Sequence, residues 1–262
     1  MLPLGEQIPL GEQIHLWLVH LDQLEHSQIH HHRELLSDQE RKQESRFYLE
    51  KHRHQYVVTR ALVRNVLSRY EAVAPRDWIF SSNAFGRPEI ANVAVRGSGL
   101  LFSVSHTHSL IVLGVAKRRA LGVDVENVHA RGISMDIAER FFSAREAADL
   151  AKVPPKEQRD RFFQYWTLKE SYIKARGMGL SIPLDKFSFY FQHARDVKIA
   201  IQPELADCPE RWMFWQFRPT SDDLVAVCAE RTCEQPPSVT IRKAISMDLE
   251  DILEVPFCRI SQ

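Results

Sequence analysis

Two acidic residues alternate with two valines in the segment Gly122–Glu126, and their spacing marks them as candidate metal ligands. Successive side chains of a β-strand point to opposite faces of the sheet. We therefore expect Val123 and Val125 to face a core, while Asp124 and Glu126 point together to the other side. By itself this pattern also fits an ordinary solvated strand face, so the segment alone leaves both interpretations open.

A third acid, Glu170, lies on a predicted helix further along the chain. Phe163, Trp166 and Ile173 recur at helical spacing as core positions, and Glu170 falls within the same apolar stripe. A carboxylate on an apolar stripe is costly unless a cation or hydrogen-bond donors compensate its charge. Three oxygen ligands, two from a strand and one from a helix, suit a hard divalent cation such as Mg²⁺.

The composition is that of a soluble globular protein. The 262 residues include 34 basic and 34 acidic side chains, so no global field recruits nucleic acid or a membrane. No apolar run reaches the roughly 20 residues of a membrane helix, and the N-terminus lacks the regions of a signal peptide. The four cysteines form no C-x-x-C pair, which predicts reduced thiols in a cytoplasmic protein. The run of histidines at 30–32 carries little weight as a metal site.

Local patterns predict helices and strands without strict alternation, which favours the α+β class over a doubly wound sheet. Helices are expected over about 36–48, 52–70 and 134–141, from the capping box at 143–146, and over 163–176, ended by the positive φ of two glycines, 177 and 179. Strands are expected over about 14–19, 78–80, 100–104, 110–116, 122–126, 187–191, 212–217, 224–229 and 239–242. The basic run Lys117–Arg119 is the candidate boundary between two halves.

Several ordered segments together resemble the 4'-phosphopantetheinyl transferases, in particular the larger monomeric type that activates peptide synthetases. The resemblance covers about residues 36–189. The segments that carry it are Phe85-Gly-Arg-Pro88, Ser103-Val-Ser-His106, Gly122-Val-Asp-Val-Glu126, Arg140-Phe-Phe-Ser143 and Trp166-Thr-Leu-Lys-Glu-Ser-Tyr-Ile-Lys174 with the following Gly177-x-Gly179-Leu180.

This resemblance implies two pseudo-symmetric α+β halves, with coenzyme A and Mg²⁺ in the cleft between them. Residues 1–117 would form the half that grips the nucleotide, and residues 118–262 the half with the metal site and the catalytic helix. The implied reaction is attack by a serine of an apo acyl or peptidyl carrier protein on the β-phosphorus of coenzyme A. The phosphopantetheine arm moves to the serine, and adenosine 3',5'-bisphosphate leaves.

The same resemblance assigns the reacting centre to four residues. Asp124, Glu126 and Glu170 would hold Mg²⁺, with Glu126 the least certain ligand because the family does not always carry an acid there. Lys174 lies four residues after Glu170, on the same helix face, where it would steady the pyrophosphate and could protonate the leaving group. Asp124, Glu170 and Lys174 are the catalytic candidates.

The remaining assignments concern coenzyme A, and the resemblance gives them to basic, hydroxyl and turn residues. The predicted contacts are Arg46, Arg60, Gly86, Arg87, Pro88, Ser103, Ser105, His106 and Lys174, with Arg46 and His106 nearest the 3'-phosphate. Arginine suits a phosphate because its planar fork donates parallel hydrogen bonds. The chain departs from the family by carrying Glu40 and Gln43 where some members have lysines.

Other interpretations remain at this stage. A different Mg²⁺-dependent phosphate enzyme is one, although the sequence contains no P-loop motif; a catalytically silent binding module is another. Glu146 is either a capping residue or a general base. The carrier is expected to dock near the helix at 134–141, where the candidates are Arg131, Met135, Ile137 and Arg140. Ile137 and Phe141 lie four residues apart and fit a core face equally well.

Overall fold

The computed structural model describes residues 7–24, 29–129, 136–232, 237–244 and 250–261. Its helices are α1 (Ile29–Glu34), α2 (Asp38–Glu44), α3 (Glu50–Leu67), α4 (Asp136–Phe141), α5 (Ala144–Lys152) and α6 (Pro155–Arg176). Its strands are β1 (Ile14–His20), β2 (Phe80–Ser82), β3 (Pro88–Ile90), β4 (Leu100–His106), β5 (Leu110–Lys117), β6 (Leu121–Asn127), β7 (Phe187–Tyr190), β8 (Lys198–Ile201), β9 (Trp212–Phe217), β10 (Asp223–Glu230), β11 (Val239–Ala244), β12 (Glu250–Leu253) and β13 (Phe257–Ile260).

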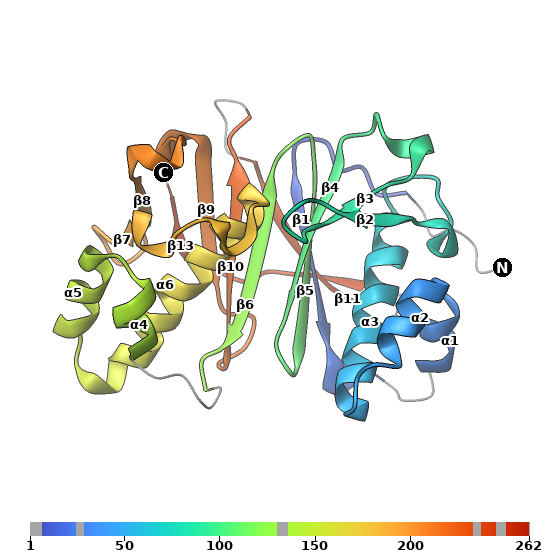
Figure 1. Ribbon diagram of the computed structural model, residues 1–262, viewed down its shortest axis with the longest axis horizontal. Coiled ribbons are helices and arrows are strands. Elements are labelled where there is room, and N and C mark those ends of the chain that lie inside the picture. The colour runs from blue at the N-terminus through green and yellow to red at the C-terminus, as the bar shows by residue number, and fades with distance from the viewer. Residues whose placement is uncertain (1–6, 25–28, 130–135, 233–236, 245–249, 262) are drawn as a thin grey trace.

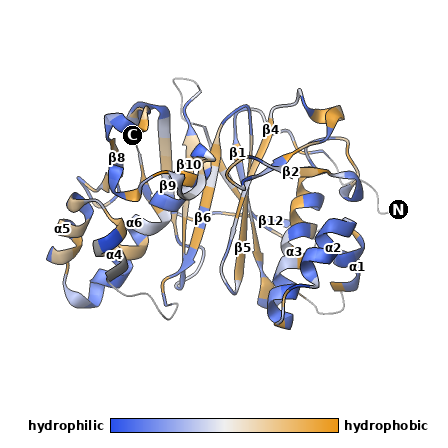
Figure 2. Cartoon of the chain, in the orientation of Figure 1, coloured by the Kyte–Doolittle hydropathy of each residue, from blue (hydrophilic) through white to orange (hydrophobic). Residues whose placement is uncertain are grey.

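Two sheets form the centre of the molecule, and helices cover their outer faces (Figure 1). The first sheet has the order β12-β11-β1-β5-β4, and the second has the order β13-β9-β10-β6. Alternate residues of β1, β5, β6, β9 and β10 meet in an apolar core between the two sheets. A second core joins α3 to the first sheet, and a third joins α6 to the second sheet. The apolar colouring of Figure 2 follows these buried faces. The α+β class expected from the sequence is confirmed.

The long helices lie where the sequence patterns predict them, although α6 begins at Pro155, eight residues before the expected start at 163. The predicted stripe of α3 is buried in the second of these cores, which contains Val58, Leu62 and Val66. Gly177 has a φ of 66° and ends α6 in the left-handed region, where a residue without a Cβ is free of strain. In the described parts of the chain, no helix is long and apolar enough to cross a membrane.

The last strands cross back from the second half to the first sheet. Strand β11 pairs in parallel with β1, and β12 continues that sheet, although both come from the end of the chain. A single boundary at Lys117 therefore does not assign all strands to the two sheets. Residues 239–253 come after this boundary, yet they complete the sheet that begins near the N-terminus. This pairing is non-local, and no local pattern announces it. The division into domains at this boundary stays a prediction.

The edge strands β4 and β6 meet where the two sheets come together. The hydroxyl oxygen of Ser103 accepts a hydrogen bond from the amide of Val123 at 3.0 Å, and that of Ser105 accepts one from Val125 at 3.3 Å. These side chains satisfy backbone donors on the free edge of β6, which would otherwise be costly to bury. The seam fixes β6 against the first half of the chain.

Strand β6 also lies directly under α6, and Gly122 makes this close approach possible. A Cβ atom at Gly122 would lie 2.0 Å from the carbonyl oxygen of Ser171 and 2.4 Å from the amide nitrogen of Ala175. Both neighbours are backbone atoms of the helix, so the side chain of any other residue would force β6 and α6 apart.

We therefore expect Gly122→Ala to lower the free energy of unfolding by about 3 kcal/mol, because overpacking against backbone cannot relax through a side-chain rotation. Chemical denaturation measures this loss. Gly97→Ala is the matched control, since a Cβ at Gly97 meets nothing within 4 Å. Equal stabilities of the two variants would contradict the close packing of β6 on α6.

Candidate active site

The three predicted metal ligands lie together between β6 and α6. Val123 and Val125 face the core between the sheets, so Asp124 and Glu126 point toward α6, as the alternation of the strand predicts. Burial, followed by the nearby charges of Asp124 and Glu170, raises the pKa of Glu126 to about 7. Burial also raises the pKa of Glu170 to about 6, with a second contribution from Asp124. The raised values show that these carboxylates crowd negative charge into a poorly solvated place.

Lys174 extends its ammonium group into this acidic cluster. Its Nζ donates to Oδ1 of Asp124 at 2.7 Å and to the hydroxyl oxygen of Ser105 at 2.9 Å. The Asp124 side chain is only 5% exposed, and the Ser105 hydroxyl donates a further hydrogen bond to Oδ1 at 3.0 Å. Lys174 is thus the cation that balances Asp124 in this conformation.

The second oxygen of Asp124 tests whether the site suits a metal ion. Oδ2 is buried and has no hydrogen-bond partner, which is unfavourable for an anionic oxygen. Within the described residues, no three His, Cys, Asp or Glu side chains converge closely enough to hold a metal ion in this conformation. An oxygen without a partner and two carboxyls with raised pKa values nevertheless fit a hard divalent cation, because such an ion would neutralise all three groups.

Trp166 contributes to the same cluster, although its spacing indicated only a core residue. Its indole Nε1 donates to Oε1 of Glu126 at 3.2 Å, while its ring stacks on Phe162 with centroids 5.8 Å apart. The hydrogen bond opposes the rise in the Glu126 pKa and holds the carboxylate in one orientation. Helical periodicity could not reveal this contact, because the partner lies on another element.

A cavity of about 320 Å³ opens beside Lys174 and Glu170. Its walls come from the turn before β3, from the middle of β4 and from the C-terminal part of α6. The lining residues are Phe85, Gly86, Arg87, Pro88, Phe102, Ser103, Val104, Glu170, Ile173, Lys174, Gly177 and Gly179. Five of the predicted contacts to coenzyme A, namely Gly86, Arg87, Pro88, Ser103 and Lys174, are therefore brought together at one cavity.

The Arg87 side chain binds backbone carbonyls of two other elements, which its sequence motif did not indicate. Its Nη1 donates to the carbonyl of Ala175 at 3.1 Å, and its Nη2 donates to the carbonyl of Leu121 at 3.1 Å. Asn83 supports the same turn by donating to the carbonyl of Gly177 at 2.8 Å. The guanidinium thus caps the C-terminal end of α6 and links it to β6, where a cation is favoured by the helix dipole.

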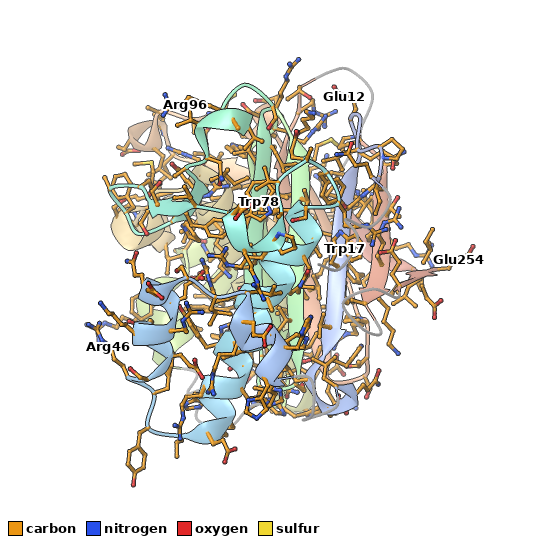
Figure 3. All side chains as sticks on the ribbon, turned by 90° about the vertical axis from the view of Figure 1, so that its right-hand side faces the viewer. Glu12, Trp17, Arg46, Trp78, Arg96 and Glu254 are labelled. Carbon is orange, nitrogen blue, oxygen red and sulfur yellow. The ribbon has the colours of Figure 1, made fainter. Side chains whose placement is uncertain are left out.

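The remaining predicted coenzyme contacts lie outside the lining of this cavity. Ser105 lies at the seam described above, and His106 follows it at the exposed end of β4, where desolvation and then Lys174 lower its pKa. Arg46 extends into solvent beyond α2 and donates to Gln43 (Figure 3). Arg60 is held by the buried carboxylate of Glu40.

Glu40 has a clear role in this arrangement. Its carboxylate also pairs with Arg64 at 2.7 Å, and the Arg64 side chain is only 1% exposed. An acid at position 40, where some relatives have a lysine, therefore balances a buried arginine of α3. The roles of Arg46, Arg60 and His106 toward coenzyme A stay predictions.

The capping interpretation of Glu146 is confirmed. Ser143 and Glu146 form a reciprocal capping box at the start of α5. The Glu146 carboxylate is fully buried, pairs with Lys169 at 2.8 Å and accepts from the amide of Phe189. These contacts commit it to joining α5, α6 and β7.

The expected carrier-docking helix is only partly described. Arg131, Met135 and the side chain of Ile137 lie outside the described residues. Arg140 is exposed, and Phe141 leaves 39% of its surface exposed.

Comparison with known proteins decides the family. Residues 120–228 match the model of the 4'-phosphopantetheinyl transferase superfamily, and residues 23–118 match the model of the 4'-phosphopantetheinyl transferase N-terminal region. The 4'-phosphopantetheinyl transferase HetI of Nostoc sp. is 35% identical over 172 residues, which are 66% of this chain and 72% of HetI. The chain belongs to the 4'-phosphopantetheinyl transferase family.

Two relatives from Bacillus subtilis extend this result. The 4'-phosphopantetheinyl transferase Sfp is 33% identical over 173 residues, covering 66% of this chain and 74% of Sfp. Another 4'-phosphopantetheinyl transferase is 32% identical over 194 residues, covering 74% of this chain and 82% of the relative. The family-model match over residues 120–228 contains the acidic cluster. The protein described here is accordingly an enzyme of the 4'-phosphopantetheinyl transferase class.

The raised carboxyl pKa values predict how stability depends on pH. Between about pH 4.5 and 7 the folded chain retains a proton on Glu126 that the unfolded chain releases, so the free energy of unfolding falls as pH rises through this window. Glu126→Gln removes this proton linkage. In the presence of EDTA we expect the variant to be more stable than the parent by about 2 kcal/mol at pH 7.5 and by under about 1 kcal/mol at pH 5.

Urea denaturation at the two pH values measures the difference. Glu204→Gln, at an exposed position of the second half, is the control and should change stability equally at both. A Glu126→Gln variant whose stability relative to the parent does not depend on pH would show that Glu126 is solvated rather than crowded.

Proposed function

We propose that this enzyme uses Mg²⁺ to transfer the 4'-phosphopantetheine arm of coenzyme A to a serine of an apo carrier protein or carrier domain. The observation that carries the proposal is the buried Asp124, with one oxygen on Lys174 and the other without a partner, beside a cavity formed by both halves. Family membership supports coenzyme A as the co-substrate. We further infer that the protein acts as a monomer in the cytoplasm on carriers of fatty acid, polyketide or peptide synthesis.

Asp124, Glu170 and Glu126 would hold the Mg²⁺ ion. When bound, the ion supplies Lewis-acid neutralisation of charge on the pyrophosphate, which is the main requirement of phosphoryl transfer. The Trp166 hydrogen bond occupies Oε1 of Glu126 and orients this carboxylate within the cluster. Asp124 is buried and the other two acids are half-buried, so little water screens the charge of the cluster.

Lys174 supplies the second positive charge of the site. Asp124 and Ser105 hold its ammonium group next to the cavity that would receive the pyrophosphate. The carrier serine oxygen attacks the β-phosphorus, and the bond from this phosphorus to the bridging oxygen breaks. Negative charge grows on the departing adenosine 3',5'-bisphosphate, and the Lys174 ammonium stabilises it by donating a hydrogen bond.

Arg87, Ser103 and Ser105 act on the geometry of the site. They join the first half of the chain to β6 and to the end of α6, which carry the acidic cluster and Lys174. The cavity therefore keeps its shape only while these cross-links hold. Arg46, Arg60 and His106 would provide the positive charge for the 3'-phosphate.

The test is incubation of the purified enzyme with coenzyme A, Mg²⁺ and an apo carrier, followed by the intact mass of the carrier. We expect the carrier to gain one phosphopantetheine group only when all components are present. An unmodified carrier, with the enzyme folded and coenzyme A bound, would instead indicate a silent binding module. Release of nucleotide without modification of the carrier would indicate a hydrolase.

Substitutions separate the roles of the cluster. Asp124→Ala should abolish transfer, whereas Lys174→Ala should lower kcat by about 100-fold with a small effect on the KM for coenzyme A, because the ammonium acts on charge that develops during the reaction. Lys156→Ala, at the exposed start of the same helix, is the control and should leave both parameters unchanged. Near-normal turnover of Asp124→Ala at saturating Mg²⁺ would contradict the proposal.

A further inference from the structure

A second cavity of about 320 Å³ lies on the other side of the Arg87–Pro88 segment. It shares this segment and Phe102 with the cavity of the active site, but it contains neither Glu170 nor Lys174. Its wall combines apolar side chains, including Ile90 and Val95, with three arginines and one acid, Glu89. The function proposed above assigns no role to this cavity.

The three arginines differ in whether their side chains interact with other residues of the protein. The Nη atoms of Arg87 donate to carbonyls of α6 and β6, and the charge of Arg87 is opposed by Glu89. Among the described residues, in contrast, the exposed side chains of Arg96 and Arg118 have no hydrogen-bond or ion-pair partner within the protein (Figure 3 labels Arg96). The cavity therefore has two free guanidinium groups at its wall.

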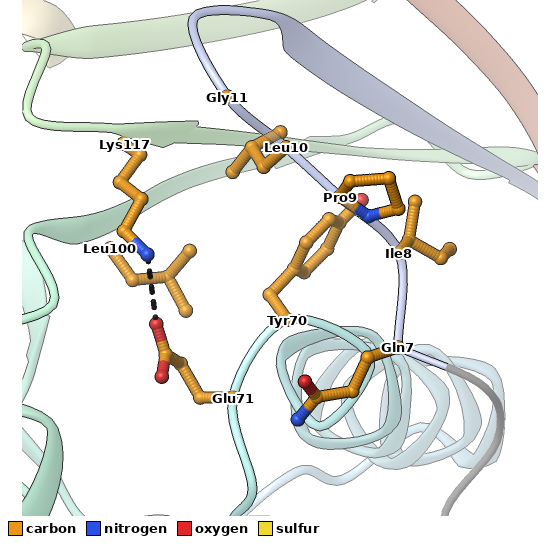
Figure 4. A pocket seen from close by; sticks show the side chains of 9 residues that line it. All are labelled: Gln7, Ile8, Pro9, Leu10, Gly11, Tyr70, Glu71, Leu100 and Lys117. Atoms are coloured by element: carbon orange, nitrogen blue, oxygen red, sulfur yellow. Dashed lines mark hydrogen bonds and ion pairs between the residues drawn. The ribbon is translucent and has the colours of Figure 1, made fainter.

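The neighbours of Arg118 in the basic run Lys117–Arg119 are both paired. Lys117 contacts Glu71 at 3.4 Å in an adjoining cavity of about 290 Å³ under the N-terminal arm, which is drawn in Figure 4. Arg119 is buried and pairs with Glu12 at 3.1 Å. The adjoining cavity is thus neutralised by its own ion pair, whereas the cavity at Arg118 is not.

The backbone at Arg118 is held in an unfavourable conformation. Its φ of 53° lies in the left-handed region, which costs a residue with a Cβ about 1 kcal/mol or more. Gly99 faces it with a φ of 71°, and a Cβ at Gly99 would lie 2.4 Å from Cγ of Arg118. The absence of a side chain at Gly99 therefore makes room for the Arg118 side chain at the cavity. Arg118 lies in the turn between β5 and β6, where its backbone amide donates to the carbonyl of Gly99 at 2.7 Å, and this turn places the Arg118 side chain at the cavity.

We propose that this cavity binds a small phosphate monoester that carries an apolar group. Two free guanidinium groups match the charge and the parallel hydrogen bonds of a phosphate. The apolar wall formed by Ile90, Val95 and Phe102 gives space for the organic group, which is why an ester should bind more tightly than inorganic phosphate. The site adjoins the coenzyme cavity and shares Phe102 with it, but Arg96 and Arg118 lie outside that cavity, and the proposed binding does not depend on the proposed reaction.

Titration calorimetry at constant ionic strength tests this site, with phenyl phosphate as the probe and saturating coenzyme A in both solutions. Phenyl phosphate should bind, and the affinities of inorganic phosphate and of benzoate should each be lower by at least about tenfold. Arg118→Gly removes the charge and relieves the backbone strain, so it should fold at least as stably as the parent while losing about tenfold or more in affinity. Arg96→Gln should show a similar loss.

Ala206→Gly is the matched control, because Ala206 is the other described non-glycine residue at positive φ, with a φ of 48°. It should gain stability as Arg118→Gly does and leave the affinity for phenyl phosphate unchanged. Binding that is absent in the parent, or equal in the parent and in Arg118→Gly, would overturn the proposal. Benzoate binding as tightly as phenyl phosphate would overturn the preference for a phosphate. A separate titration of each variant with coenzyme A reports on the active site independently.

Discussion

The two halves of the chain meet along β4 and β6 through serine hydroxyls instead of a backbone ladder, and the active site depends on this seam. Ser103 and Ser105 satisfy two amides of β6, while Ser105 also contacts Asp124 and Lys174. The Ser105 side chain thus binds both the backbone of β6 and two residues of the proposed active site. Because β6 carries two of the three acids, any displacement along the seam would change the distances between the acids and the cavity.

The acidic cluster is stabilised by the packing around it and not by its own interactions. Gly122 brings β6 against the backbone of α6, and Arg87 fastens the end of that helix to both β6 and the first half. The carboxylates then lie close together in a poorly solvated place, where burial, followed by the neighbouring negative charges, raises the pKa of Glu126 and of Glu170 above ordinary values. Lys174 relieves part of this repulsion by placing a positive charge beside Asp124.

The sequence predicts the features of this site that depend on local periodicity. Alternation along β6 places Asp124 and Glu126 on one face, and the helical stripe orients Glu170 toward them, because both patterns follow from the geometry of a single element. The resemblance to a known family added the fold and the order of the motifs. It could not show that Arg87 and Ser103 bind the protein's own backbone, since these contacts join segments far apart in the chain.

Other features that the sequence did not predict also depend on contacts between distant segments of the chain. The return of β11 to the first sheet requires a pairing across most of the sequence, and nothing in the strand itself specifies its neighbour. Glu40 could only be recognised as the partner of Arg64 once α2 and α3 had been placed together. The contact of Trp166 with Glu126 was similarly hidden, because the helical stripe accounts for its ring but not for its indole nitrogen.

The central claim is that Asp124 organises a divalent-cation site that Lys174 balances when the metal is absent. Binding of Mn²⁺, a spectroscopic substitute for Mg²⁺, can be measured by electron paramagnetic resonance without coenzyme A at neutral pH. The account predicts one bound ion in the parent protein, at least tenfold weaker binding in Asp124→Asn, and tighter binding in Lys174→Met because the competing ammonium is removed. Equal Mn²⁺ affinity in all three proteins would contradict it.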